Sequence, residues 1–192
     1  MPVTINGNGS ITGLVVGGLP NGTVDADTLA SGLATQGIRM VDQWRLTANT
    51  TITQSTAYYI DSNWERVDSD NFGQLGTGMT QSSGIFTFPS TGIYLIQTTT
   101  NFRKPDGGAG AFAYITVSND GGSSFNDAAL SLGRISSANT YSTATCSHVL
   151  DVTDTSQIKV MLKAYVTSAS TVAEGNTDRT MTSMTFIRLG DT

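Results

Sequence analysis

Hydrophobic and polar positions alternate with a period of two along much of the chain after residue 43, which is the pattern of β-strands. Turns that contain glycine, proline or asparagine separate these segments at short intervals. The pattern predicts about nine or ten strands, within residues 43–52, 57–60, 64–67, 85–88, 94–102, 111–117, 130–135, 141–152, 157–166 and 181–189. Strands of this number and spacing are typical of an all-β sandwich or jelly roll.

Residues 84–96 hold two of these strands and the turn between them. Pro89 must end the first strand, because proline brings no N–H to a sheet. Ser90, Thr91 and Gly92 then provide a bend. Alternation divides the second strand into two faces, Ile93 with Leu95 and Tyr94 with Ile96.

Two of the predicted strands carry apolar side chains on both faces. In 111–117, Phe112 and Tyr114 alternate with alanine, isoleucine and valine, and in 157–166 Met161 and Tyr165 alternate with an aliphatic series. One face can fill the sandwich, so the other is expected to be covered from outside. A monomer with a few exposed aromatic side chains is the alternative.

The central segment also resembles the C1q/TNF-like jelly-roll family. The residues that carry the resemblance are Gly84, Phe86, Phe88, Pro89, Gly92 and Tyr94. Residues 147–152 and 185–189 are similar to two later strands of the family, so the resemblance spans about residues 44–190. It implies a jelly-roll knob over 44–192 that forms a homotrimer about a threefold axis. The interface residues that we expect from it are Tyr94, Phe112, Tyr114, Tyr165 and Phe186.

Residues 1–43 have a different composition and are expected to form an N-terminal anchoring arm. They contain eight of the 21 glycines and no aromatic residue, so they cannot enclose a core of their own. Asp25 or Asp27 can cap at most one short helix, over 28–34. Residues 5–14 and 17–24 are similar to the openings of tailed-bacteriophage tail-fibre and other virion proteins, which dock to the particle. The predicted anchoring residues are Ile5, Ile11, Leu14, Val15, Val16, Leu19, Val24 and Leu29.

Composition excludes several classes of partner. The net charge of −5 does not favour binding to a phosphate backbone, so nucleic acid is not an expected partner. The sequence has no apolar run of transmembrane length and does not open with a signal-peptide pattern, so we expect neither membrane insertion nor secretion. With Cys146 as its one cysteine the chain forms no internal disulfide, and its stability must come from burial and from oligomerisation.

The sequence offers little for catalysis. His148 and Cys146 share one face of a predicted strand, but no second histidine or cysteine completes a zinc site within one chain. No Gly-x-Ser-x-Gly elbow accompanies the histidine, which rules against a serine hydrolase. We therefore expect a chain that is not an enzyme, although a depolymerase acting through two unrecognised carboxylates is an alternative.

The acidic loop 68–73 is the candidate for a calcium site. Asp68 and Asp70 supply carboxylates, but Phe72 stands where a third oxygen ligand is required and Met79 where a bidentate glutamate is required. A solvated loop without a metal is the other interpretation, and no cofactor is expected.

The leading functional prediction is a structural protein of a tailed-phage virion, assembled in the host cytoplasm. A trimeric fibre or knob would be fastened to the tail by residues 1–43 and would present its loops to a host-surface glycan or protein. The alternative is a capsid decoration protein or head fibre with no receptor role. The candidate host-contact residues lie in the loops 104–110 and 169–180, at Lys104, Asp106, Ala169, Glu174 and Asp178.

Overall fold

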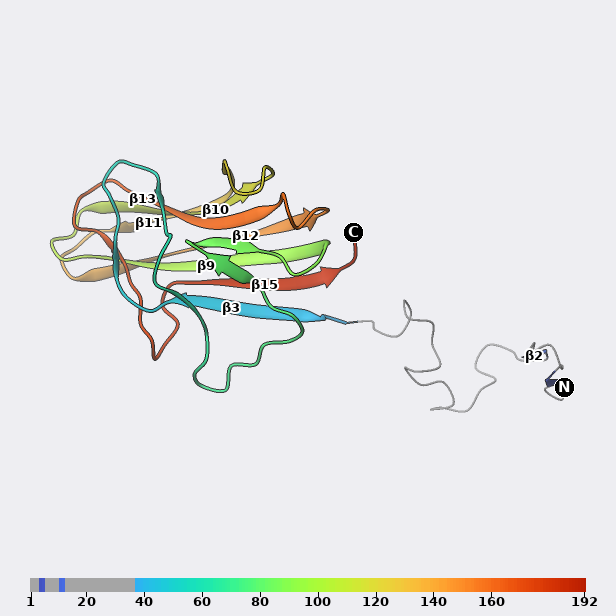
Figure 1. Cartoon of the computed structure of the whole chain (residues 1–192). Coiled ribbons are helices and arrows are strands. Elements are labelled where there is room, and N and C mark those ends of the chain that lie inside the picture. The colour runs from blue at the N-terminus through green and yellow to red at the C-terminus, as the bar shows by residue number, and fades with distance from the viewer. Residues whose placement is uncertain (1–3, 6–10, 13–36) are drawn as a thin grey trace. The chain divides into compact units, whose positions relative to one another are not determined.

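A computed structural model describes residues 4–5, 11–12 and 37–192 of the chain (Figure 1). The chain divides into two compact units, Met1–Gly37 and Ile38–Thr192. In the first unit, β1 (Thr4–Ile5) and β2 (Ile11–Thr12) form an antiparallel pair that places Ile5 opposite Ile11. The predicted helix over 28–34 lies outside the described residues. So do the other six predicted anchoring residues, Leu14, Val15, Val16, Leu19, Val24 and Leu29.

The second unit is a sandwich of two antiparallel sheets. The larger sheet has the order β12-β9-β15-β3-β6, and β14 joins β4 to the end of β9 beside β15. Its strands are β3 (Met40–Leu46), β4 (Thr50–Thr51), β6 (Trp64–Arg66), β9 (Gly92–Lys104), β12 (Thr140–Val152), β14 (Val172–Ala173) and β15 (Ser183–Gly190).

The smaller sheet has the order β11-β10-β13-β8-β7, with β5 also paired to β13. Its strands are β5 (Tyr58–Tyr59), β7 (Thr80–Ser82), β8 (Ile85–Thr87), β10 (Ala109–Ser118), β11 (Asn126–Ile135) and β13 (Lys159–Val166). The described residues contain no helix, and therefore none that could cross a membrane. The prediction of an all-β jelly-roll sandwich is confirmed.

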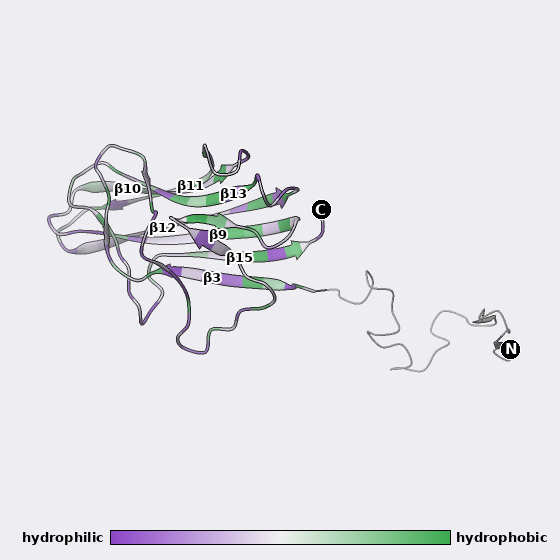
Figure 2. Cartoon of the chain, in the orientation of Figure 1, coloured by the Kyte–Doolittle hydropathy of each residue, from purple (hydrophilic) through white to green (hydrophobic). Residues whose placement is uncertain are grey.

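The core lies between the two sheets and is built from one face of each long strand. On β10 and β13 the buried face is the aliphatic one, and Figure 2 shows the hydrophobic bands along these strands. An aromatic cluster fills one part of the core around the fully buried Phe86. Its ring centroid lies 5.3 Å from that of Trp64 and 5.1 Å from that of Phe186. Such pairs add to the hydrophobic gain from burying the rings.

The turn before β8 depends on a glycine that the sequence motif contains. Gly84 is buried and has a φ of +73°, and a Cβ at this position would collide with the backbone carbonyl oxygen of Ile60. Both the left-handed backbone and the close approach therefore require glycine. This requirement gives a physical reason for one residue of the central motif.

The start of the sandwich differs from the sequence prediction. The predicted strand 43–52 is two strands, β3 and β4, with a bend over 47–49, and β3 begins at Met40. The compact unit thus begins at Ile38, and the predicted boundary at residue 44 is six residues too late. The start of β3 was missed because Asp42, which is fully buried, occupies an inward position in the strand. A charged residue at a core position breaks the alternation that predicts a strand.

Candidate functional site

The outward face of the larger sheet combines an apolar row with a polar one. On β9, Ile93 and Leu95 point outward, whereas Tyr94 and Ile96 are fully buried in the core. Strand register aligns the apolar row across four strands as Val149, Leu95, Ile187 and Val41. The next outward row is polar and consists of Ser147, Gln97, Thr185 and Gln43. The chain leaves this face uncovered in part, since Leu95 and Ile187 are only half-buried.

The outward face of the smaller sheet carries aromatic side chains. Phe112 of β10 lies opposite Tyr165 of β13, with ring centroids 5.7 Å apart. The ammonium of Lys163 lies 4.0 Å from the ring centroid of Tyr114 and also pairs with the carboxylate of Asp127. Phe112, Tyr114 and Tyr165 are half-buried within one chain, and their assignment to a trimer interface stays a prediction.

The other two predicted interface residues lie in the interior. Tyr94 and Phe186 have no exposed surface, and both rings contact Phe88, at centroid distances of 4.7 and 6.3 Å. The hydroxyl of Tyr94 donates to the backbone carbonyl of Ser90 at 2.9 Å. Their assignment to the interface is wrong, because side chains enclosed between the two sheets cannot contact another chain. Alternation predicted the two faces of β9 correctly, but Tyr94 was placed on the wrong one.

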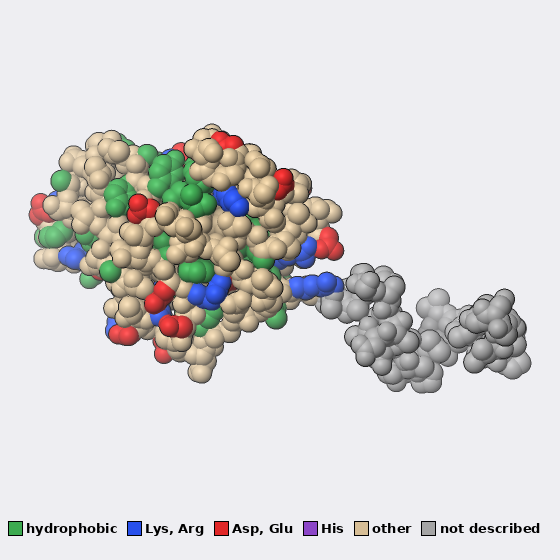
Figure 3. Space-filling view, viewed as in Figure 1, with side chains coloured by type: hydrophobic (Ala, Val, Ile, Leu, Met, Phe, Trp, Pro, Cys, Tyr) green, Lys and Arg blue, Asp and Glu red, His purple; other side chains and the backbone are tan. Residues whose placement is uncertain are grey.

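Large exposed hydrophobic side chains gather at two opposite edges of the sandwich. Four lie on β11 and β12, the neighbouring edge strands of the two sheets: Leu130, Leu132, Tyr141 and Val149. The other three lie at or beside β3 and the end of β15: Ile38, Leu75 and Leu189. Figure 3 shows apolar patches of this kind on a surface with few charges. Each edge thus offers apolar surface that a second chain can cover.

Loops form the end of the sandwich opposite to the point where the chain enters β3. Met40 lies opposite Arg188 near the C-terminal end of β15, which Figure 1 shows beside the C-terminus. The loops after β9, β11 and β13 lie at the other end and are tied together, since Gly108 N–H donates to the carbonyl of Ile135 at 2.8 Å and Ser168 donates to Gly108. Entry of the chain and display of the loops therefore occur at opposite ends.

Two of the predicted host-contact residues are not available in these loops. Lys104 and Glu174 are buried, Lys104 paired with Asp106 and Glu174 paired with Arg103. These two predictions are wrong, because the charge of each residue is satisfied by a neighbour within the chain. Asp106, Ala169 and Asp178 are exposed, and their contact with a host surface stays a prediction.

A buried charge network that no sequence pattern predicted joins β3 to β6. The carboxylate of Asp42 accepts hydrogen bonds from Arg66 at 2.9 Å, from the Trp44 indole at 3.0 Å and from the backbone N–H of Met79 at 2.7 Å. The Arg66 guanidinium also lies 4.8 Å from the Trp44 ring centroid. Each of these groups is engaged in contacts within the sandwich, so the network has no group available for chemistry.

The candidate metal ligands do not meet. Among the described residues, no three histidine, cysteine, aspartate or glutamate side chains are grouped to hold a metal ion. In the acidic loop, Asp68 pairs with Arg45 at 2.8 Å. The Cys146 thiol lies 3.8 Å from the carbonyl oxygen of Ala113, and burial raises its pKa, which disfavours the reactive thiolate.

Comparison with known proteins gives matches at the level of structure. No family model and no curated protein matches the sequence. Eiger TNF from S. frugiperda is similar with a TM-score of 0.60 at 8% identity, over 82% of this chain and 96% of that one. Murine APRIL at pH 5.0 is similar with a TM-score of 0.53 at 15% identity, over 78% and 98%. At such low identity the likeness concerns the fold alone, and the second unit of this chain is therefore a TNF-like jelly roll.

Proposed function

We propose that this chain is a non-enzymatic virion protein of a tailed phage: a homotrimeric TNF-like knob that an N-terminal arm fastens to the tail and that contacts the host surface. The observation that carries the proposal is the pair of apolar edges on opposite sides of the sandwich. The similarity of residues 5–24 to the openings of virion proteins supports the phage setting.

The two edges favour a cyclic assembly. They carry different residues, with Leu132 and Val149 on one edge and Leu75 and Leu189 on the other, so a contact of one edge with the other is not the self-matching contact of a twofold dimer. A contact between two different patches repeats from chain to chain and closes into a ring when its rotation permits. Three copies would bury both edges of every chain, which supports the threefold arrangement known for the fold family that the sequence resembles.

The two ends of the sandwich fit an attachment role. The arm joins the end that carries Met40 and Arg188, and the loops with Asp106, Ala169 and Asp178 lie at the opposite end. A trimer would present three such loop ends side by side. Three weak contacts made together give avidity that one contact lacks.

The trimer is tested by adding charge to one edge. Full-length Val149→Asp and Leu132→Asp variants should be monomers by multi-angle light scattering at micromolar concentration, whereas the natural protein should be a trimer, because a carboxylate buried without a partner destabilises an interface. Thr153→Asp, on an exposed turn, is the matched control and should remain trimeric. A monomeric natural protein, or trimeric edge variants, would contradict the proposed assembly.

The location on the particle is tested with antibodies to the knob. Immunogold labelling of the tail, together with loss of adsorption to cells, is the expected result for a host-attachment protein. Labelling of the head without any effect on adsorption would instead favour a capsid decoration protein or head fibre. Particles made with an Ile5→Asp, Ile11→Asp double variant should lack the protein if the arm is the anchor.

A further inference from the structure

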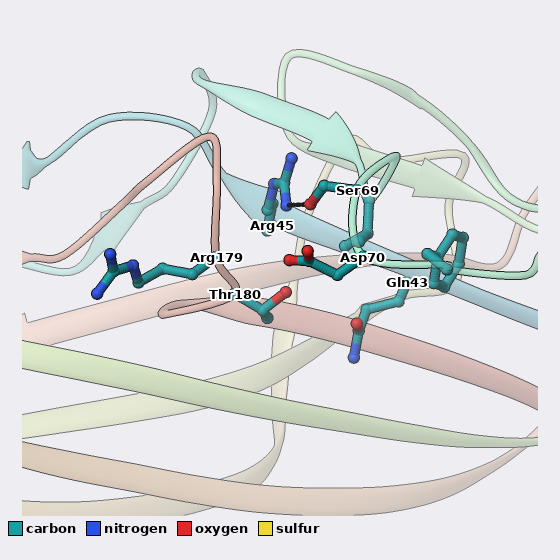
Figure 4. Close-up of a pocket in the computed structure, with 8 residues that line it drawn as sticks. Gln43, Arg45, Ser69, Asp70, Arg179 and Thr180 are labelled. Carbon is teal, nitrogen blue, oxygen red and sulfur yellow. Dashed lines mark hydrogen bonds between the residues drawn. The ribbon is translucent and has the colours of Figure 1, made fainter.

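A small cavity lies on the larger sheet, between β3 and two loops, one of which is the connection before β15 that also carries Asp178. Its volume is about 220 Å³. Gln43 of β3, the loop after β6 and the connection before β15 form its walls (Figure 4). Its lining includes Gln43, Arg45, Asp70, Phe72, Arg179 and Thr180.

One wall of this cavity is fixed from beneath by a buried arginine. The Arg45 side chain is 1% exposed and donates to Glu65, Asp68 and Ser69, each at 2.8 Å. The loop closes through a 3.2 Å hydrogen bond from Phe72 N–H to the Ser69 carbonyl, with Asp70 at a left-handed φ of 56°. Asp70 thus lies in a hydrogen-bonded turn with its side chain exposed, while the charge of Arg45 is already balanced by Glu65 and Asp68.

Several polar groups of the cavity remain free to bind a ligand. Gln43 donates one N–H to Thr185 at 2.8 Å and keeps its amide oxygen. Among the described residues, no hydrogen bond involves the side chain of Asp70 or of Thr180. Figure 4 shows the Asp70 and Thr180 oxygens pointing toward each other beside Gln43, with Arg179 extending away from them. Phe72 and Val67 add apolar surface to the same walls.

We propose that this cavity binds one neutral sugar ring, such as the terminal residue of a glycan. A sugar has hydroxyl groups that can donate to Asp70 and Gln43 and an apolar C–H face that can pack on Phe72. Pockets for drug-sized molecules are larger, about 300–1,000 Å³, so this volume suits a single ring.

Other ligand classes fit these walls less well. An anion would meet the carboxylate of Asp70, which offsets the charge of Arg179, and the guanidinium of Arg45 is already paired. A purely apolar molecule would bury the Asp70 and Thr180 oxygens without partners, which is unfavourable. A metal ion would find one carboxylate, because Asp68 is engaged with Arg45.

A sugar site would identify a glycan as the class of molecule that the proposed host contact recognises. Only this biological role of the cavity rests on the proposed function. Binding itself requires neither the trimer nor the phage particle. The oligomeric state is therefore measured on the same samples, so that failure of one proposal can be told from failure of the other.

Saturation-transfer NMR and isothermal titration with the full-length protein test the site, using the methyl α-pyranosides of glucose, galactose and mannose. At least one should bind with millimolar affinity. Asp70→Asn should weaken that binding about tenfold or more, since it removes a hydrogen bond to a charged acceptor. Asparagine tolerates the left-handed backbone, so the turn should persist. Asp61→Asn, an equal charge change at an exposed site outside the cavity, should leave the affinity unchanged.

Three results would overturn the sugar site. The first is no signal from any of the three pyranosides at about 50 mM, which is far above a millimolar dissociation constant. The others are equal affinity of Asp70→Asn and the natural protein, and tighter binding of glucosamine or N-acetylneuraminic acid than of every neutral sugar. Loss of sugar binding in Asp70→Asn with an unchanged trimer supports it. A monomeric protein that still binds a neutral sugar would contradict only the assembly.

Discussion

At the start of β9, two apolar side chains point to each side of the sheet but meet different surroundings. Tyr94 and Ile96 point inward and are completely buried, whereas Ile93 and Leu95 point outward and are half-buried. The chain itself buries the first pair, through Phe88, which follows β8, and Phe186 of the neighbouring strand β15. The burial of the second pair is left incomplete. The inward side therefore determines the fold, and the outward side is available for contacts between molecules.

Charged residues differ between the two sides in the same way. On β3, Asp42 points inward and is held by Arg66, Trp44 and Met79 within the sandwich. Arg45 points outward and is buried by the loop that it fastens, which also forms a wall of the proposed sugar cavity. A buried charge on the inside thus joins strands, and one on the outside positions a surface loop.

The largest expected effect is loss of the central core ring. Phe86→Ala should lower the free energy of unfolding by about 3–5 kcal/mol, because it leaves a cavity among Trp44, Trp64 and Phe186. Urea unfolding followed by tryptophan fluorescence measures it. Leu95→Ala on the outward side is the matched change and should cost a monomer less than about 1.5 kcal/mol. Equal losses at the two positions would contradict the division of β9 into a folding side and an assembly side.

A smaller effect is expected at the buried aspartate. Asp42→Asn keeps the shape of the side chain but removes the charge that Arg66 and the N–H of Met79 require. The cost should be about 2–3 kcal/mol, below that of a fully enclosed pair, because Arg66 is partly exposed. Thermal and urea unfolding both report it. An unchanged free energy of unfolding in Asp42→Asn would show that the network does not stabilise the β3–β6 pairing.

The smallest effect concerns an exposed turn on the other sheet. Hydrogen bonds from the hydroxyls of Ser124 and Ser118 and from backbone N–H groups lower the pKa of Asp120. A lowered pKa in the folded state contributes stability above the ordinary value of about 3.9, and acidification below it removes that stability. The urea midpoint of the natural protein should therefore fall between about pH 5 and pH 2, and Asp120→Asn should lose less over this range. If the urea midpoints of the two proteins fell equally with pH, this role for Asp120 would be contradicted.

Much of the sandwich could be predicted because its signals are local. The alternation in β10 and β13 and the turn at Pro89 each depend on neighbours along the chain, whereas the glycine requirement at Gly84 also depends on the carbonyl of Ile60. The boundary at Ile38 was missed because Asp42 lies at a core position, and only its contact with Arg66, from another strand, makes that position tolerable. The exposure of Lys104 and Glu174 was mispredicted for a related reason, because each is buried beside an oppositely charged residue that pairs with it in the fold.

By itself, the sequence of this protein determined an all-β jelly roll and the division of each strand into two faces, since alternation follows from the geometry of the extended backbone. Only the tertiary structure decided which face is inside. A period of two is unchanged when its faces are exchanged, so the side of Tyr94 depends on the sheet that packs against it. The apolar edges at β11–β12 and β3–β15 and the cavity beside Gln43 likewise join residues distant in sequence, and no local pattern specifies them.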